Sequence, residues 1–354
     1  MMEAERPLPM PPLLRVNANG LYCETGDFYV DPWCSVATAV ITHAHSDHAR
    51  WGSDRYLTSE PGVAVLRARM GESARIEAIS YGEAVVHNGV RVSLHPAGHI
   101  LGSSQIRLEY RGEVWVVSGD YKLDPDPTCT PFEAVRCHTF ITESTFGLPI
   151  YRWPAENVVA AAINDWWRSN QQLGLASVIF AYSLGKAQRV LAALDAAIGP
   201  IYCHGAVERL NGLYRAAGVR LPATHYAHDA GKDVDWSRAC ILAPPSAAGS
   251  IWLRRFSPVS TSFASGWMRI RGTRRRRALD RGFVLSDHAD WPGLLAAISA
   301  TGAECVMVTH GYRAPLVRWL EEHGKQARAI ETRFEGEQDE GTAEGSNDDA
   351  GEPA

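Results

Sequence analysis

The chain has 354 residues and a formal net charge of -5, with 45% hydrophobic and 21% charged residues. This composition is typical of a folded globular protein and excludes collagenous, coiled-coil and largely disordered proteins. The length predicts about two domains, and no apolar run reaches the roughly 20 residues that cross a bilayer. The first 14 residues contain four prolines and lack the basic start and apolar stretch of a signal peptide. We therefore expect a cytoplasmic protein that does not associate with membranes.

Charge is distributed unevenly along the chain. Residues 335–354 carry eight acidic side chains and no Lys or Arg, so the remainder has a net charge of +3. A segment this polar cannot bury enough apolar surface to order itself, and we predict a disordered acidic tail. Seven arginines lie within residues 269–281, among them Arg274, Arg275, Arg276 and Arg277. This cluster is either a solvated loop or a surface that binds a polyanion.

Residues 14–150 are predicted to form the first part of a β-rich domain. Short apolar and β-branched runs alternate there with Gly, Pro and Asp, which is typical of strands joined by tight turns. A turn at Arg111-Gly112 predicts that the strands on either side of it form a hairpin. The predicted strands include residues 28–30, 37–42, 90–95, 105–110 and 113–117.

Residues 151–262 show a different pattern, in which strands alternate with helices. Pro154 begins a helix whose apolar residues recur at helical spacing, and Gly199-Pro200 ends the next helix. This alternation predicts a small parallel α/β unit. Its predicted strands cover residues 177–182, 201–204 and 240–243, and its later helices cover residues 186–198 and 207–217.

The β-rich pattern resumes over residues 263–334. Helices are expected to begin at Pro292 and Pro315. Because this pattern matches the one before residue 151, we predict that the α/β unit is inserted into the β-rich domain. The expected strands cover residues 282–285, 305–309 and 328–334.

Four potential metal ligands, His43, His45, Asp47 and His48, lie within six residues directly after a predicted strand. Imidazole and carboxylate are ligands that zinc and similar divalent ions accept, and a loop leaving a strand can direct alternate side chains to one point. One ion cannot readily take all four side chains and keep an open coordination position. We therefore expect two ions in this region.

Three further residues are placed to complete such a centre. His99 lies in a glycine-rich turn between predicted strands, Asp120 follows one predicted strand, and His310 ends another. Each of them alone is more commonly a turn residue or a hydrogen-bonded histidine. Their joint position at strand ends indicates that they contribute to one site.

The ordered set of these ligands resembles the metal motifs of the metallo-β-lactamase fold, with Asp31 at the early structural aspartate. The segments TESTFG at residues 142–147, LSDHAD at 285–290 and VTHG at 308–311 resemble the three additional motifs of the β-CASP nucleases. The resemblance covers nearly the whole chain except the acidic tail. It implies an α/β fold, a metallo-β-lactamase αββα sandwich with an inserted β-CASP-type α/β domain over residues 151–262. Within that group, the sequence is most similar to the bacterial exonucleases associated with DNA ligase and helicase repair operons.

The resemblance also implies a role for each residue of the site. Asp47 would orient the attacking water, His288 would protonate the leaving group, and Glu143 would accept the other N–H of His288. The implied function is a metal-dependent DNA exonuclease that hydrolyses phosphodiester bonds in DNA repair, with DNA ligase and helicase proteins as partners. The two divalent ions, zinc or manganese, would be held by His43, His45 and His99 on one side and by Asp47, His48 and His310 on the other, with Asp120 as the bridge.

Nucleic-acid contacts are expected in the inserted unit. Residues 181–188 resemble a turn that approaches nucleic acid in β-CASP proteins, and Ser183, Lys186 and Arg189 lie at this turn, where N–H groups favour phosphate. Alternatively, these three residues only cap the helix that begins there. Residues 274–277 would add phosphate contacts, which give affinity without sequence specificity.

Other functions compete with this one. A histidine in the last motif, as at His310, is usual in RNA-processing β-CASP members, so an RNA-processing ribonuclease is the strongest alternative. A glyoxalase II-like hydrolase shares the first motif, but such enzymes lack the insert and a counterpart of His288. A catalytically silent nucleic-acid-binding subunit usually loses metal ligands, and here all seven are present. Gly185-Lys186 is not a P-loop, because Phe180 and Ala187 replace the required glycine and hydroxyl residue.

Overall fold

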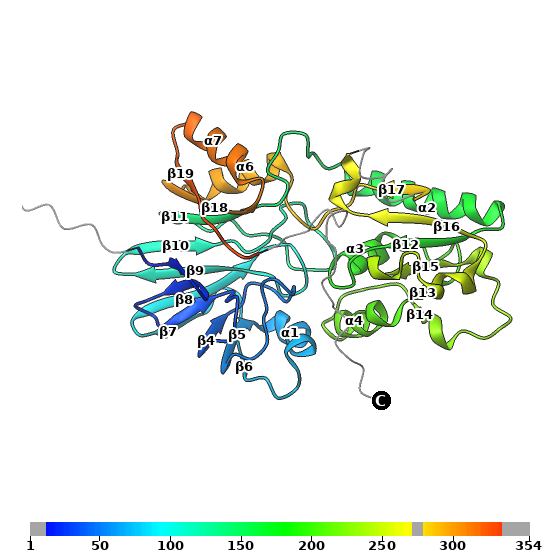
Figure 1. Cartoon of the computed structure of the whole chain (residues 1–354), viewed down its shortest axis with the longest axis horizontal. Helices are drawn as coiled ribbons and strands as arrows, with labels where there is room; N and C mark the ends of the chain where they lie inside the picture. The colour runs from blue at the N-terminus through cyan, green and yellow to red at the C-terminus, as the bar shows by residue number, and fades with distance from the viewer. Residues whose placement is uncertain (1–11, 271–278, 335–354) are drawn as a thin grey trace, which may run out of the picture. The chain divides into compact units, whose positions relative to one another are not determined.

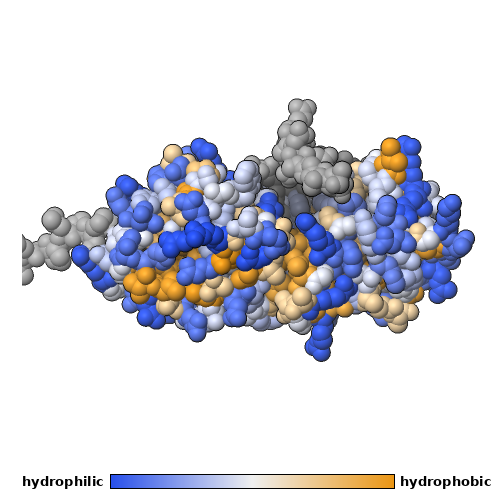
Figure 2. Space-filling model, turned by 90° about the horizontal axis from the view of Figure 1, so that it is seen from below, coloured by the Kyte–Doolittle hydropathy of each residue, from blue (hydrophilic) through white to orange (hydrophobic). Residues whose placement is uncertain are grey.

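The computed structural model describes residues 12–270 and 279–334 and divides into two compact units. Unit 1 contains the described residues up to 150 and those from 287 to 334, and unit 2 contains the described residues between them. The predicted acidic tail lies outside the described residues. Within the described ranges, every helix is too short or too polar to cross a membrane. The face in Figure 2 mixes hydrophilic side chains with smaller hydrophobic areas.

Unit 1 contains two β-sheets, one of six and one of seven strands (Figure 1). The first consists, in spatial order, of β1 (Arg15–Asn17), β2 (Gly20–Cys23), β3 (Phe28–Val30), β4 (Thr38–Val40), β5 (Arg55–Ser59) and β6 (Ile76–Ile79). The second consists of β19 (Gln326–Ala329), β18 (Cys305–Gly311), β11 (Thr139–Ser144), β10 (Glu113–Val117), β9 (Ser104–Tyr110), β8 (Val90–Pro96) and β7 (Ala84–His87). The helices are α1 (Val63–Met70), α6 (Trp291–Thr301) and α7 (Arg313–Glu322).

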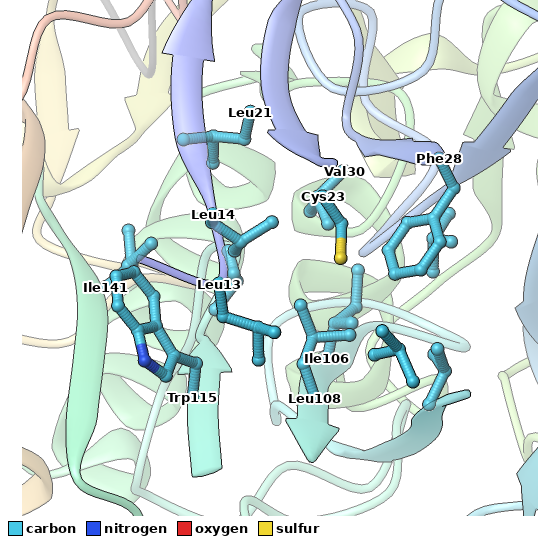
Figure 3. Close-up of a cluster of buried hydrophobic side chains, with 14 of the residues drawn as sticks. Leu13, Leu14, Leu21, Cys23, Phe28, Val30, Ile106, Leu108, Trp115 and Ile141 are labelled. Atoms are coloured by element: carbon cyan, nitrogen blue, oxygen red, sulfur yellow. The ribbon is translucent and has the colours of Figure 1, made fainter. Parts of the chain in front are cut away.

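The main core of unit 1 lies between its two sheets. Leu21 and Phe28 of the first sheet belong to the same buried cluster as Ile106 and Leu108 of β9 (Figure 3). A second apolar cluster joins the other face of β10, β11 and β18 to α6 and α7. Because side chains alternate along a strand, each of these three strands contributes to both clusters.

Two-residue turns set the register of the second sheet. At Asn88-Gly89 the φ angles are 46° and 85°, and at Arg111-Gly112 they are 50° and 83°. Positive φ at both positions is the geometry of a type I′ turn, whose twist matches that of the strands it joins. The predicted turn at Arg111-Gly112 accordingly connects β9 and β10, which pair antiparallel.

Unit 2 contains one six-stranded sheet in which all five pairings are parallel. Its strands, in spatial order, are β14 (His225–Tyr226), β13 (Ile201–Cys203), β15 (Cys240–Ala243), β12 (Ala176–Phe180), β16 (Val259–Ala264) and β17 (Arg281–Phe283). Its α-helices include α2 (Glu156–Gln172), α3 (Lys186–Ala193) and α4 (Gly205–Ala216). Strands and helices alternate along this part of the chain, as the sequence pattern predicts.

The boundary between the units differs from the sequence prediction. The sequence pattern assigns the strand at residues 282–285 to the β-rich domain, but its counterpart β17 pairs with β16 in unit 2. Unit 1 therefore resumes at Asp287 instead of residue 263. The physical reason is that a short apolar strand can join either sheet, and the parallel hydrogen bonds to β16 decide between them.

Two element ends differ from the predictions by several residues. The helix predicted over residues 186–198 ends at Ala193, because Leu194 is extended and the N–H of Asp195 bonds to the side chain of Asn164 at 2.9 Å. The last strand ends at Ala329 instead of residue 334. Beyond it the N–H of Ile330 still bonds to Val308 of β18, but its carbonyl accepts a hydrogen bond from the side chain of Arg313 at 2.9 Å, so regular pairing with the sheet stops there.

Candidate metal centre

The predicted ligands all belong to unit 1, where they lie in loops after strands or near strand ends. Strands β10, β11 and β18 are parallel neighbours, so their carboxyl ends meet at one edge of the second sheet. Residues that are distant in sequence are thereby brought together. His43, His45, Asp47 and His48 follow β4, His99 lies between β8 and β9, Asp120 follows β10, and His310 lies near the end of β18.

Four ligand atoms form a first cluster, the His43 group, which consists of His43, His45, His99 and Asp120. The Nδ1 atom of His45 lies 3.1 Å from Nε2 of both His43 and His99. The carboxylate oxygen Oδ2 of Asp120 lies 3.5 Å from Nε2 of His43 and 3.9 Å from Nε2 of His99. These atoms lie within 4.8 Å of one another and can therefore hold a single cation.

A second cluster, the His48 group, consists of His48, Asp120 and His310. Nε2 of His48 lies 3.6 Å from Oδ2 of Asp120, and Nε2 of His310 lies 3.2 Å from Oδ1. Asp47 adds a carboxylate oxygen 3.6 Å from Nε2 of His48. The carboxylate of Asp120 therefore belongs to both groups.

Acceptor groups behind the imidazoles fix their orientation. Nδ1 of His48 lies 2.7 Å from the carboxylate of Asp31, and Nδ1 of His99 lies 2.8 Å from the backbone carbonyl of Asp287. A carboxylate and a carbonyl only accept hydrogen bonds, so in both rings Nδ1 is assigned a proton and Nε2 faces the centre. The motif resemblance indicated Asp31, but a backbone carbonyl carries no residue-type signal, so the role of Asp287 was not predicted.

The polar atoms of the centre fit a divalent cation. Within the described part of the chain, Nε2 of His48, Nε2 of His310 and Oδ1 of Asp120 are buried without a hydrogen-bond partner of proper geometry. Leaving buried polar atoms unpaired is costly, and folded proteins rarely do so. Imidazole nitrogens and carboxylate oxygens that converge in this way suit zinc or manganese.

Burial and charge act in opposite directions on these groups. Burial lowers the pKa of His43 well below its usual value and that of His99 to about 3. Burial also opposes protonation of His48, but the carboxylates of Asp120 and Asp47 outweigh it and raise the pKa of His48 to about 10. Burial disfavours the charged form of Asp120, yet the neighbouring imidazoles, with His48 first, hold its pKa well below its usual value. The carboxylate of Asp120 thus stays ionised next to the neutral imidazoles of His43 and His99, whereas the imidazole of His48 is held in its protonated form by the carboxylates beside it.

His288 and Glu143 form a buried pair beside the two groups. Nδ1 of His288 lies 2.9 Å and 3.1 Å from the two carboxylate oxygens of Glu143, and Oε1 also accepts the backbone N–H of Tyr121 at 2.8 Å. Burial opposes protonation of His288, but Glu143 and then Asp120 outweigh it and raise its pKa to about 9. The ring centroid of His288 is 4.7 Å from that of His99. A protonated imidazole next to a candidate metal centre can donate a proton to a leaving group.

The nucleic-acid contacts predicted in unit 2 are placed differently from the ligands. Lys186 and Arg189 have buried side chains, and Ser183 is half-buried. Nη1 of Arg189 lies 3.3 Å from the carboxylate of Glu156, so this guanidinium already has an anionic partner within unit 2. The arginines at residues 274–277 lie outside the described residues.

Comparison with curated proteins finds relatives whose names refer to nucleic-acid processing. The chain is 31% identical over 324 residues to "Probable DNA ligase" of Opitutus terrae, covering 88% of this chain and 30% of that protein. It is 29% identical to "Cleavage and polyadenylation specificity factor subunit 3" of Dictyostelium discoideum, over 34% of this chain and 16% of that protein. It is 23% identical to "RNase J-like protein" of Methanocaldococcus jannaschii, over 55% of this chain and 53% of that protein. The chain therefore spans about a third of the first relative and about half or less of the others.

These relatives confirm the resemblance that the motifs indicate. They include nucleases of the β-CASP group of the metallo-β-lactamase fold, and the chain is similar to that group. No family model matches the sequence. A solved structure of a protein of unknown function from Enterococcus faecalis superposes with a TM-score of 0.57 at 12% identity, over 84% of this chain and 80% of the other. At this identity the superposition shows a shared fold alone.

Proposed function

We propose that this protein is a metal-dependent nuclease of the β-CASP group that hydrolyses phosphodiester bonds in DNA, acting as an exonuclease in DNA repair. The observation that carries the proposal is the position of Asp120 between the His43 group and the His48 group, with the His288–Glu143 pair alongside. The relative named as a probable DNA ligase supports DNA as the substrate and a ligase as a partner. A helicase is the second partner that we propose.

The residues present fit two divalent ions, zinc or manganese. The His43 group would hold one ion, the His48 group together with Asp47 would hold the other, and Asp120 would bridge them. Bound divalent ions would lower the pKa of a water molecule towards neutrality and neutralise the oxygens of the scissile phosphate. This donor set does not distinguish the two metals, because nitrogen and oxygen ligands suit both.

The remaining steps belong to side chains of this chain. The carboxylate of Asp47 would accept a hydrogen bond from the attacking water and orient it. His288 would donate its Nε2 proton to the leaving alkoxide, while Glu143 accepts the N–H at Nδ1, fixes the tautomer and stabilises the imidazolium. General acid catalysis of this kind contributes about 10²- to 10⁴-fold to the rate.

We propose that unit 2 is the inserted β-CASP-type domain and that it contributes to nucleic-acid binding. Its position in the chain, between the two parts of unit 1, and its parallel α/β sheet support this assignment. Ser183, Lys186 and Arg189 are retained as contacts to test, although the buried pair of Arg189 with Glu156 favours a structural role for that arginine. The four arginines at residues 274–277 remain a prediction from the sequence.

A second candidate function is RNA processing. It is favoured by the relatives named as a cleavage and polyadenylation factor and an RNase J-like protein, and by the presence of His310 in the last motif. The chemistry at the metal centre would be the same for both substrates. The difference would lie in how the sugar and the strand are bound.

The deciding experiment compares end-labelled single-stranded DNA, duplex DNA and RNA. Full-length protein is treated with a chelator and then assayed on each nucleic acid without metal and after addition of Zn²⁺ or Mn²⁺. A thioester is assayed in the same way to test the glyoxalase II-like alternative. We expect metal-dependent shortening of DNA from an end. Faster cleavage of RNA than of DNA would establish the second candidate, and absence of any nucleic-acid hydrolysis by the metal-loaded protein would overturn both.

A further inference from the structure

Phe334, the last residue that the structure describes, contacts both histidines of the His48 group. Its ring is stacked on the imidazole of His48, with centroids 4.4 Å apart and an interplanar angle of 12°. It meets the imidazole of His310 edge-on, with centroids 5.9 Å apart and an interplanar angle of 85°. The ring is buried, with 8% of its surface exposed. One aromatic side chain thus supports two of the three residues in this group.

The segment that carries Phe334 is held on unit 1 by several contacts. After β19 ends, the N–H of Ile330 bonds to the carbonyl of Val308 in β18 at 2.9 Å. The guanidinium of Arg333 lies over the ring of Trp33 at 5.4 Å, and Phe334 meets the same indole edge-on at 6.5 Å. Trp33 closely follows Asp31, the carboxylate that bonds to His48. The segment is therefore anchored next to the residues that orient this histidine.

We propose that Phe334 is a positioning residue for the metal site formed by His48, Asp120 and His310. Asp31 fixes Nδ1 of His48, and the flat contact with Phe334 fixes the plane of the ring, so the two together set the direction of Nε2. A ring of this kind also attracts a cationic partner, and an imidazole that is protonated or bound to a metal ion is one. The inference rests on the metal binding in the proposed function.

Phe334 also limits the space behind the ligands. A cavity of about 10 Å³ is lined by Phe334, His48 and His310, together with Asp31 and residues of β10, β11 and β18. That volume is at the lower limit for one water molecule. Removing the ring would open this space to water, which could then compete for the nitrogens and for Asp31. Loss of an outer partner of a metal ligand typically lowers metal affinity about 10- to 100-fold.

The test measures Zn²⁺ affinity of the full-length protein by competition with a chromophoric chelator, and the visible spectrum after loading with Co²⁺. All variants are made in a His43→Ala background, which weakens metal binding at the His43 group. The Zn²⁺ that still binds then reports on the His48 group. We expect Phe334→Ala to lower the Zn²⁺ affinity of the His48 group about 10- to 100-fold and to shift the Co²⁺ spectrum. Phe334→Tyr should retain near wild-type affinity because it keeps the flat ring.

Two further variants separate positioning from space filling and from folding. Phe334→Leu fills much of the space without a flat ring and should stay weak, so full affinity in this variant would overturn the proposal. Ile330→Ala is the matched control, since Ile330 packs against the same apolar cluster in the same segment, and it should bind Zn²⁺ normally. Equal Zn²⁺ affinity of Phe334→Ala and wild type would also overturn the proposal. If wild-type protein binds no Zn²⁺ or Mn²⁺, the proposed function itself fails.

Discussion

Gln188 and Asn211 of unit 2 are as deeply buried as His48 and Asp120 of unit 1, but their polar atoms are bonded differently. The amide of Gln188 accepts the N–H of Gly185 at 2.8 Å and donates to the side chain of Asn211 at 2.9 Å. Asn211 in turn donates to Glu208 at 3.1 Å. This network is closed, because each amide atom has a partner inside unit 2.

The cluster in unit 1 is left open by contrast. Among the residues that the structure describes, Nε2 of His48 and Oδ1 of Asp120 are buried without a hydrogen-bond partner of proper geometry, and neighbouring nitrogens point at one another. Burial of polar side chains therefore does not by itself indicate a site. Unpaired acceptor atoms that converge on one point do, because only a bound group can compensate for their lost hydration.

The largest expected effect is at the shared carboxylate. Asp120→Ala should reduce hydrolysis to background and remove tightly bound metal, because both groups lose a ligand. The fold should persist, since the carboxylate lies among imidazoles at a strand end. Metal analysis, circular dichroism and a nuclease assay would check this, with Asp124→Ala in the same loop as the control. Unchanged turnover with full metal content would disprove the two-ion arrangement.

His288→Ala tests whether the pair with Glu143 acts on the reaction or holds a metal. We expect the rate of cleavage to fall about 10²- to 10⁴-fold while metal content stays constant, because a proton donor is lost and no proposed ligand is removed. His95→Ala is the matched control, since His95 also faces a carboxylate, that of Glu133 at 3.5 Å, without entering either metal-binding group. Loss of metal from His288→Ala would make His288 a ligand instead.

Asp31→Asn removes the charge behind His48 and should lower metal affinity about 10- to 100-fold, with the fold retained. Asparagine suits the position because Asp31 has a φ of 43°, which Asn tolerates better than most residues. Asp27→Asn is the control, since Asp27 also has positive φ, at 54°, and bonds only to Tyr22 among the side-chain partners described. Chelator competition measures both variants, and equal affinities would show that Asp31 does not act through His48.

The smallest effects are expected in the closed network of unit 2. Asn211→Ala should lower the free energy of unfolding by about 1–3 kcal/mol, because the amide N–H of Gln188 and the carboxylate of Glu208 each lose a partner. Hydrolysis per folded molecule should stay close to wild type. Arg168→Ala, which removes an exposed ion pair with Asp195, should cost less than about 1 kcal/mol. Urea unfolding measures the free energy of unfolding of both variants. A loss of activity without a loss of stability in Asn211→Ala would show that the network in unit 2 acts on the reaction and is not merely structural.

Much of the candidate site could be predicted from the sequence because its ligands follow local rules. The spacing of His43, His45, Asp47 and His48 after an apolar strand needs no tertiary information. The positions of Asp120 and His310 follow from the strands before or around them, since strand type and strand end are set by short-range patterns. These features determined the expected chemistry, and the structure brings the residues into two groups that share one carboxylate.

Features that depend on contacts between distant segments could not be predicted in this way. The apolar run at β17 suits either sheet, and its pairing with β16 placed it in unit 2. The backbone carbonyl of Asp287 holds His99, although the two residues are 188 positions apart and a carbonyl has no sequence signal. Phe334 reaches His48 because the chain turns away from the sheet after β19. Local sequence patterns therefore indicate which side chains could bind a metal, whereas long-range packing places the groups that orient and enclose them.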